Sequence, residues 1–195
     1  MPRPLDLPQR RRDITAIALR ILSEVGLDGL TLKAIAVELG GSITLVTHIY
    51  PTRRDLLLGI AENLLDEYDA QLPELEAGAA DRPERLRILL EWMLPRSDAG
   101  WSQERSRIVL LSDTETGPIL ASKMDLRMRA LIREHLVGLV PADEVDEHVD
   151  LLRVLTNGIV LASVEHRSDW PAERQVRTLH AALRRLDLLP APSAT

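Results

Sequence analysis

The sequence predicts an all-α protein, and three observations lead to that fold class. Apolar residues recur every three or four positions over most of the 195 residues, as they do on one face of a helix. Glycine and proline interrupt this pattern at intervals that suit helix ends. The sequence contains no Asn-Gly hairpin turn and no extended alternation of apolar and polar residues, which would indicate paired strands. About nine helices fit between the interruptions.

Composition indicates a globular chain that folds without disulfides. Apolar residues make up 45% and charged residues 28%, which is too apolar for a disordered protein. Cysteine is absent, which suits a reducing compartment. No apolar run approaches the roughly 20 residues that cross a bilayer, and the start MPRPLDLPQRRRD lacks the apolar stretch of a signal peptide. We therefore expect a cytoplasmic protein without a membrane segment.

Charge is distributed unevenly along the chain. The net charge is -6, yet residues 1–56 carry eight Lys or Arg against six acidic residues. The remainder carries sixteen basic and twenty-four acidic residues. A basic head on an acidic body can approach a polyanion with one end while the other end repels it.

The N-terminal third predicts the frame of a helix-turn-helix. A first helix over 14–25 ends at Gly26, and a second is capped by Thr31 and ends at Gly40. The next segment, 42–50, reads SITLVTHIY, and its β-branched residues favour a strand in isolation. Because the capped helices around it leave no partner strand, we predict a third helix there, capped by Ser42.

The rest of the chain predicts a helical body. A fourth helix begins near Arg53 and runs to about Leu72, and five more helices follow. We expect a head over 8–68, with the helix-turn-helix at 31–50, and a body over 69–190. The Pro-rich ends, 1–8 and 191–195, are expected to fray. The predicted breaks are Pro73, 78–83, 95–100, 112–118, Pro141 and 168–171.

Residues 31–56, TLKAIAVELGGSITLVTHIYPTRRDL, resemble without a gap the helix-turn-helix pattern of the TetR/AcrR family of transcriptional regulators. The resemblance implies a non-enzymatic regulator without a cofactor. It implies a repressor that binds a palindromic DNA operator as a homodimer and is released by a small molecule. Matching positions are Thr31, Ile35, Ala36, Gly40, Ser42, Pro51 and Leu56, with conservative exchanges at Val46, Tyr50, Thr52 and Arg53.

The predicted recognition helix departs from the family pattern in ways that bear on DNA readout. Gly41, Thr47 and Ile49 replace a Val, a Tyr and a His of the pattern. Residues 42–50 contain no Arg, Lys, Asn or Gln, the side chains that read guanine or adenine edges bidentately. Ile43 and Leu45 either contact thymine methyl groups or pack within the domain. The candidate DNA contacts are Thr31, Lys33, Ser42, Ile43, Thr44, Leu45, Thr47, His48, Tyr50 and Arg53.

Arg53 and Arg54 lie in the first turn of a predicted helix, where the dipole disfavours cations and attracts anions. Thr52 and Asp55 have the spacing of a capping box. In the family, the equivalent of Arg53 meets a DNA phosphate, and a helix N-terminus suits that contact. The alternative is that Arg53 only pairs with Asp55 or faces solvent.

Residues 152–183, LRVLTNGIVLASVEHRSDWPAERQVRTLHAAL, loosely resemble the last two helices of the choline-regulator-like branch of the family, which implies a dimeric four-helix bundle. In each case below, plain core packing within one chain is the alternative. The expected pocket lining is Trp92, Met93, Trp101, Met124, Met128 and His135. The expected dimer faces are Leu152, Leu155, Ile159, Val160 and Ser163 on the first helix, with Val176, Leu179, Ala182, Leu183 and Leu186 on the second.

Two other classes of function compete with a DNA-binding regulator. An enzyme is disfavoured because the sequence has no nucleophile elbow, Gly-rich phosphate loop or HExxH motif. Glu144 and His148 have the spacing of metal ligands, but an acidic first helical turn explains them better, so we expect no metal. A protein-interaction adaptor that keeps the fold and has lost DNA binding is the stronger alternative.

Overall fold

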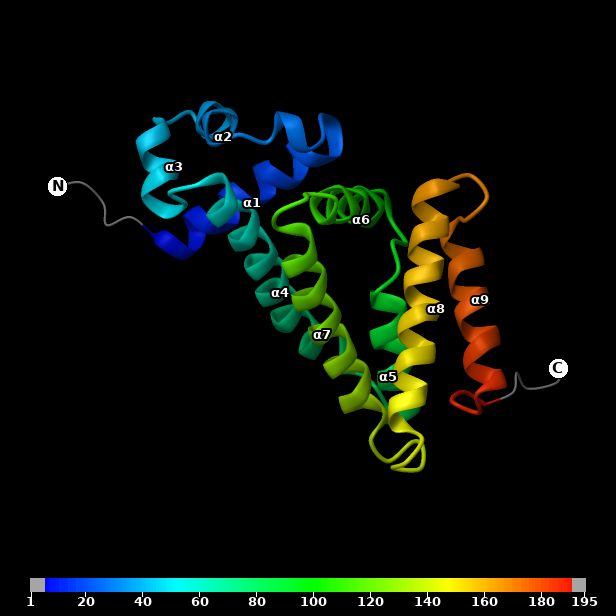
Figure 1. Cartoon of the computed structure of the whole chain (residues 1–195). Helices are drawn as coiled ribbons and strands as arrows, with labels where there is room; N and C mark the ends of the chain where they lie inside the picture. Colours follow the sequence, from blue (N-terminus) through cyan, green and yellow to red (C-terminus); the bar gives the residue numbers. More distant parts are fainter. Residues whose placement is uncertain (1–5, 191–195) are drawn as a thin grey trace. The chain divides into compact units, whose positions relative to one another are not determined.

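The computed structural model describes residues 6–190, and this part of the chain contains nine α-helices, one 3-10 turn and no strand (Figure 1). The all-α prediction is therefore confirmed. The chain forms two compact units. Unit 1 takes the chain up to Asp69 together with Arg105–Met124, and unit 2 takes Ala70–Glu104 and the chain from Asp125 onward.

Unit 1 holds the N-terminal helices. They are α1 (Leu7–Glu24), the turn η1 (Leu27–Gly29), α2 (Leu32–Glu38), α3 (Ile43–Ile49) and most of α4 (Arg53–Glu76). Helix α1 begins earlier than predicted, because Asp6 caps it by accepting from the Gln9 amide at 3.1 Å and Pro8 occupies its first turn. The expected fraying of residues 1–5 and 191–195 lies outside the described residues.

A distant segment completes the core of unit 1. The end of α6 (Asp98–Leu111) and the start of α7 (Gly117–Leu136) place Leu110 and Leu120 in the same apolar cluster as the N-terminal helices, both fully buried. The sequence predicts one division, at residue 68. The structure adds residues 105–124 to the N-terminal unit because their apolar side chains are buried there.

Unit 2 contains α5 (Arg82–Trp92), α8 (Val145–Glu165) and α9 (Ala172–Arg185), with the remaining parts of α6 and α7. Helices α8 and α9 pack side by side (Figure 1). No single helix among residues 6–190 is long and apolar enough to cross a bilayer, and α2 with α3 pass that test only as a pair bent by 119°.

The predicted break at Pro73 is wrong, since α4 continues through it to Glu76. A proline within the last turn removes only one backbone donor, and tertiary contacts hold this turn in place. Leu72 is buried, the Glu76 carboxylate accepts from Arg85 Nη2 at 2.8 Å, and Nε2 of His135 lies 2.6 Å from Glu76 Oε1. The predicted break at 95–100 is shorter than expected, because α6 already begins at Asp98.

The predicted dimer faces of α8 and α9 are mostly wrong, because six of these ten residues lie in the core of unit 2. Amphipathic spacing cannot tell which of two apolar faces a helix buries. Leu155, Val176, Ala182 and Leu186 are half-buried. The buried ones are Leu152, Ile159, Val160, Ser163, Leu179 and Leu183.

Candidate nucleic-acid interface

The helix-turn-helix predicted at 31–50 is present in unit 1. Helix α3 turns away from α2 by 119°, within the range of DNA-binding helix pairs. Gly40 permits this bend because its φ is +64°, a conformation that glycine adopts without strain. Thr31 caps α2 as predicted, with its Oγ1 accepting from the Ala34 amide at 3.0 Å. Ser42 takes the N-cap position of α3, but its side chain makes no capping bond.

One face of α3 is open to solvent. Ile43 is 48% exposed, and Thr44 and His48 are also exposed, while Val46 is fully buried. Leu45 and Thr47 are half-buried, and the Thr47 hydroxyl donates to the Thr44 carbonyl at 3.2 Å. The face therefore presents an apolar side chain, a hydroxyl and an imidazole, which can meet thymine methyl groups and make single hydrogen bonds.

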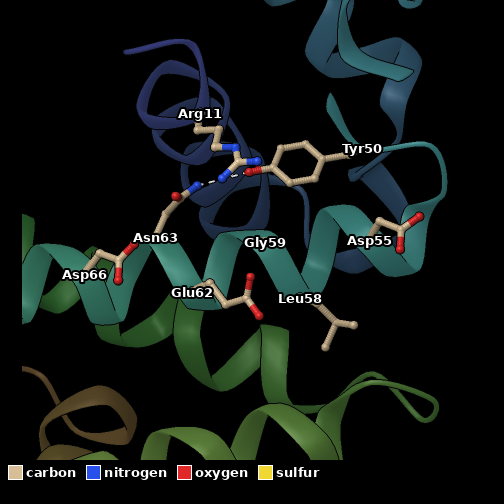
Figure 2. A pocket seen from close by; sticks show the side chains of 8 residues that line it. All are labelled: Arg11, Tyr50, Asp55, Leu58, Gly59, Glu62, Asn63 and Asp66. Atoms are coloured by element: carbon tan, nitrogen blue, oxygen red, sulfur yellow. Dashed lines mark hydrogen bonds between the residues drawn. The ribbon is translucent and has the colours of Figure 1, made fainter. Parts of the chain in front are cut away.

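Tyr50 does not fit the expected DNA contact, because it is only 5% exposed. Its ring lies on Gly59 of α4, where a Cβ would come within 2.2 Å of Tyr50 Cε1. Asn63 Nδ2 donates to the Tyr50 hydroxyl at 3.1 Å (Figure 2). It also donates to Thr15 Oγ1 at 2.8 Å. Burial raises the pKa of Tyr50. This residue fixes the end of α3 against α1 and α4.

A cavity of about 320 Å³ borders this network along α4 (Figure 2). The carboxylates of Asp55, Glu62 and Asp66 line it, and Arg11 of α1 extends toward the Tyr50 hydroxyl (Figure 2). Three carboxylates on one side of the helix repel phosphates. This side of α4 is therefore unsuited to a polyanion, whereas α3 carries no acidic side chain.

At the start of α4, Arg53 has a partner that the sequence does not predict. Arg53 Nη1 donates to Asp113 Oδ2 at 2.7 Å, so its partner is neither Asp55 nor solvent alone. Arg54 Nη1 donates to Glu115 Oε1 at 2.5 Å. The predicted capping box is present, since the Asp55 amide donates to Thr52 Oγ1 at 3.1 Å and the Thr52 amide to Asp55 Oδ2 at 3.0 Å.

Asp113 is held firmly in place. Its Oδ1 accepts from the Thr116 amide and hydroxyl, both at 2.8 Å, and from the Glu115 amide at 3.2 Å. The hydrogen bond from Arg53, with those from Thr116, holds the pKa of Asp113 well below its usual range. This carboxylate therefore stays ionised at any ordinary pH.

Sequence reasoning missed Asn63, Asp113 and Glu115. Asp113 and Thr116 have the three-residue spacing of a helix cap, and that spacing could have been noticed. The pairing of Arg53 with Asp113 spans 60 residues and has no local sequence pattern.

The residues expected to line an effector pocket are not brought together. Met124 belongs to unit 1 and the other five to unit 2. The Trp101 indole donates to the Ser163 carbonyl at 3.2 Å, and Arg167 lies 4.5 Å over its ring. Met128 is buried, and Trp92 and Met93 are half-buried. His135 borders a cavity of about 160 Å³, but Arg82, Arg85 and Glu134 make that cavity polar rather than apolar.

Glu144 and His148 interact with each other at the start of α8. Glu144 is the residue before α8, and Nδ1 of His148 lies 2.9 Å from its carbonyl oxygen. Asp146 and Glu147 form the acidic first turn. Among residues 6–190, no three His, Asp or Glu side chains gather as metal ligands would.

Comparison with solved structures identifies the fold. A transcriptional regulator from Rhodococcus sp. Rha1 superposes with a TM-score of 0.76 at 21% identity, covering 92% of this chain and 99% of that one. A regulator from Saccharomonospora viridis, solved with choline, gives 0.74 at 20% identity over 90% and 96%. A TetR transcription regulator from Haloarcula marismortui gives 0.69 at 20% identity over 93% and 98%.

The fold is therefore the one seen in solved structures of transcriptional regulators. More specifically, the chain has the TetR-type fold, as the sequence resemblance predicts. No protein-family model and no curated protein matches the sequence.

Proposed function

We propose that this chain is a DNA-binding transcriptional regulator that acts as a homodimeric, ligand-released repressor. The observation that carries the proposal is the exposed face of α3, set at 119° to a capped α2 within a TetR-type fold. The direct test is a gel shift of the purified chain with DNA from upstream of its own gene. A shift that competitor DNA reverses supports the proposal, and no shift at low salt contradicts it.

A second copy of the chain is expected to cover the outward side of α8. Leu151, Val154 and Leu161 are 45%, 72% and 48% exposed and lie on one face with Gly158 between them. Nothing lies within 4 Å of a Cβ built on Gly158, so a partner helix can approach closely there. A row of exposed apolar side chains on an outer helix suits a two-fold interface, and two-fold operators match two-fold proteins.

The effector is expected to be a small organic molecule that binds the helical body. The regulator from Saccharomonospora viridis was solved with choline, which supports this class of effector for the same fold. The chain's three Trp and two Tyr, with no Phe, favour a small effector over a flat polycyclic one.

Arg53→Ala is expected to weaken binding to every DNA sequence alike, because Arg53 at the start of α4 would contact a phosphate and not a base. The slope of log Kd against log salt should fall by about 0.9, the value of one phosphate contact. Titration of the wild type and the variant at several salt concentrations measures this slope. An unchanged slope would remove Arg53 from the interface.

The operator is expected to be palindromic, with thymine preferred where α3 enters the major groove. Ile43 can contact a thymine methyl group, and Thr44 and His48 can each make a single hydrogen bond. Shape and bendability of the DNA would supply the remaining specificity. A saturation scan of the operator measures the penalties. Several guanines that each lose more than about 2 kcal/mol would contradict this readout and would point to Lys33, the exposed cation on α2.

A protein-interaction adaptor is the second candidate, and two observations favour it. Both cations at the start of α4 are paired with acidic side chains, and α3 has no side chain for bidentate reading of a base. The gel shift separates the two candidates, since an adaptor would bind no DNA even at low salt.

A further inference from the structure

The position where the sequence predicts a DNA phosphate is occupied by the chain's own carboxylates. Asp113 and Glu115 pair with Arg53 and Arg54, and Asp55 accepts from the backbone at the same helix start. The two cations that would attract a phosphate are therefore neutralised within unit 1. A helix N-terminus attracts anions, and three carboxylates here already satisfy that preference.

We propose that Asp113, and more weakly Glu115, set the DNA affinity of this protein by competing with DNA phosphates for Arg53 and Arg54. This inference rests on the proposed DNA-binding function. We call Asp113 and Glu115 the acidic latch. In the latched state Arg53 and Arg54 are paired internally, and DNA must displace the carboxylates before its phosphates gain these contacts.

Two observations favour the view that Asp113 competes with DNA phosphates for Arg53 over the view that it orients Arg53 toward them. The Asp113 carboxylate is fixed by three donors on Oδ1 and its side chain is only 10% exposed, so it cannot withdraw to let a phosphate in. Arg53, at 45% exposure, has to be the partner that moves. Arg54 is paired in the same way, so no free cation remains at this helix start to draw a phosphate in.

Asp113→Asn tests the latch with little disturbance to the fold. The amide oxygen of Asn keeps the three bonds that Oδ1 accepts, whereas its NH2 group cannot accept from Arg53. Affinity for a mixed-sequence DNA duplex at low salt is expected to rise about fivefold, which corresponds to about 1 kcal/mol. Glu115→Gln is expected to give less than about twofold, because both members of the Arg54–Glu115 pair are exposed.

A double-mutant cycle shows whether the gain passes through Arg53. In an Arg53→Ala background, Asp113→Asn should no longer raise affinity. Glu62→Gln is the matched control, because it removes one negative charge from α4, where Glu62 pairs with Lys123 at 2.7 Å and contacts neither arginine. It should change affinity by less than about 1.5-fold. Thermal unfolding checks that each variant is folded.

The outcomes test the acidic latch separately from DNA binding. A gain with Asp113→Asn that disappears in the Arg53→Ala background supports the latch. Wild-type binding with no gain, with a loss, or with an equal gain in the Arg53→Ala background overturns the latch and leaves DNA binding intact. No binding by the wild type or by any latch variant overturns both proposals.

Discussion

Ile159→Glu is expected to unfold unit 2, whereas Val154→Glu is expected to leave it folded and to abolish the proposed dimer. Both residues lie on α8, but Ile159 is 3% exposed and Val154 is 72% exposed. A glutamate in the core has no partner, which costs more than about 4 kcal/mol. A glutamate at the exposed position changes the stability of one subunit by less than about 0.5 kcal/mol.

In a two-fold dimer formed by this face, the same position would bury one unpaired glutamate on each subunit, so Val154→Glu should weaken association by about a hundredfold or more. Circular dichroism measures the fold, and sedimentation equilibrium measures the mass. Leu183→Glu is expected to unfold unit 2 as Ile159→Glu does, because Leu183 is fully buried. It therefore tests the core of unit 2 rather than an interface. An intact dimer for Val154→Glu would place the interface on another surface.

Gly59→Ala is expected to destabilise unit 1 by about 2 kcal/mol, even though alanine is the better helix former by about 1 kcal/mol. The added methyl group would lie 2.2 Å and 2.8 Å from two carbons of the buried Tyr50 ring. The ring would have to move, and with it the end of α3 and the bond from Asn63. DNA binding should fall with stability, because Tyr50 holds the recognition helix in place.

Chemical denaturation measures the loss, and two further variants identify its cause. Gly41→Ala is the control, since its Cβ would meet only the tip of Leu45 at 3.4 Å, and stability should change by less than about 0.5 kcal/mol. Tyr50→Leu combined with Gly59→Ala should cost less than the two changes separately, because the ring is then absent. A Gly59→Ala protein as stable as the wild type would show that the ring shifts freely.

Features with short-range causes could be predicted from the sequence. The caps at Thr31 and Thr52 depend on hydrogen bonds between residues three apart, so their spacing is visible in the chain. The glycine ends of α1 and α2 follow from the left-handed backbone of Gly26 and Gly40. Residues 42–50 form a helix against their own preference, and their capped neighbours were enough to predict it.

Tertiary structure decided three features that the sequence leaves open. Helix α8 has apolar residues on two sides, and only packing with α9 and the rest of unit 2 shows that Ile159 faces inward and Val154 outward. Tyr50 looks like a DNA contact in the aligned pattern, but Gly59 provides space for its ring and makes it a core residue. Pro73 looks like a helix end, but the contacts of Glu76 extend α4 past it.

The helices, the caps at Thr31 and Thr52 and the helix-turn-helix can be predicted from the sequence, because they arise from interactions within about four residues along the chain. Which apolar face is buried and which cation is neutralised depends on how the chain packs. Burial and ion pairing depend on side chains that are distant in sequence, as the 60 residues between Arg53 and Asp113 show. No local periodicity encodes such a distance, so the pairing of Arg53 with Asp113 is visible only in the folded chain.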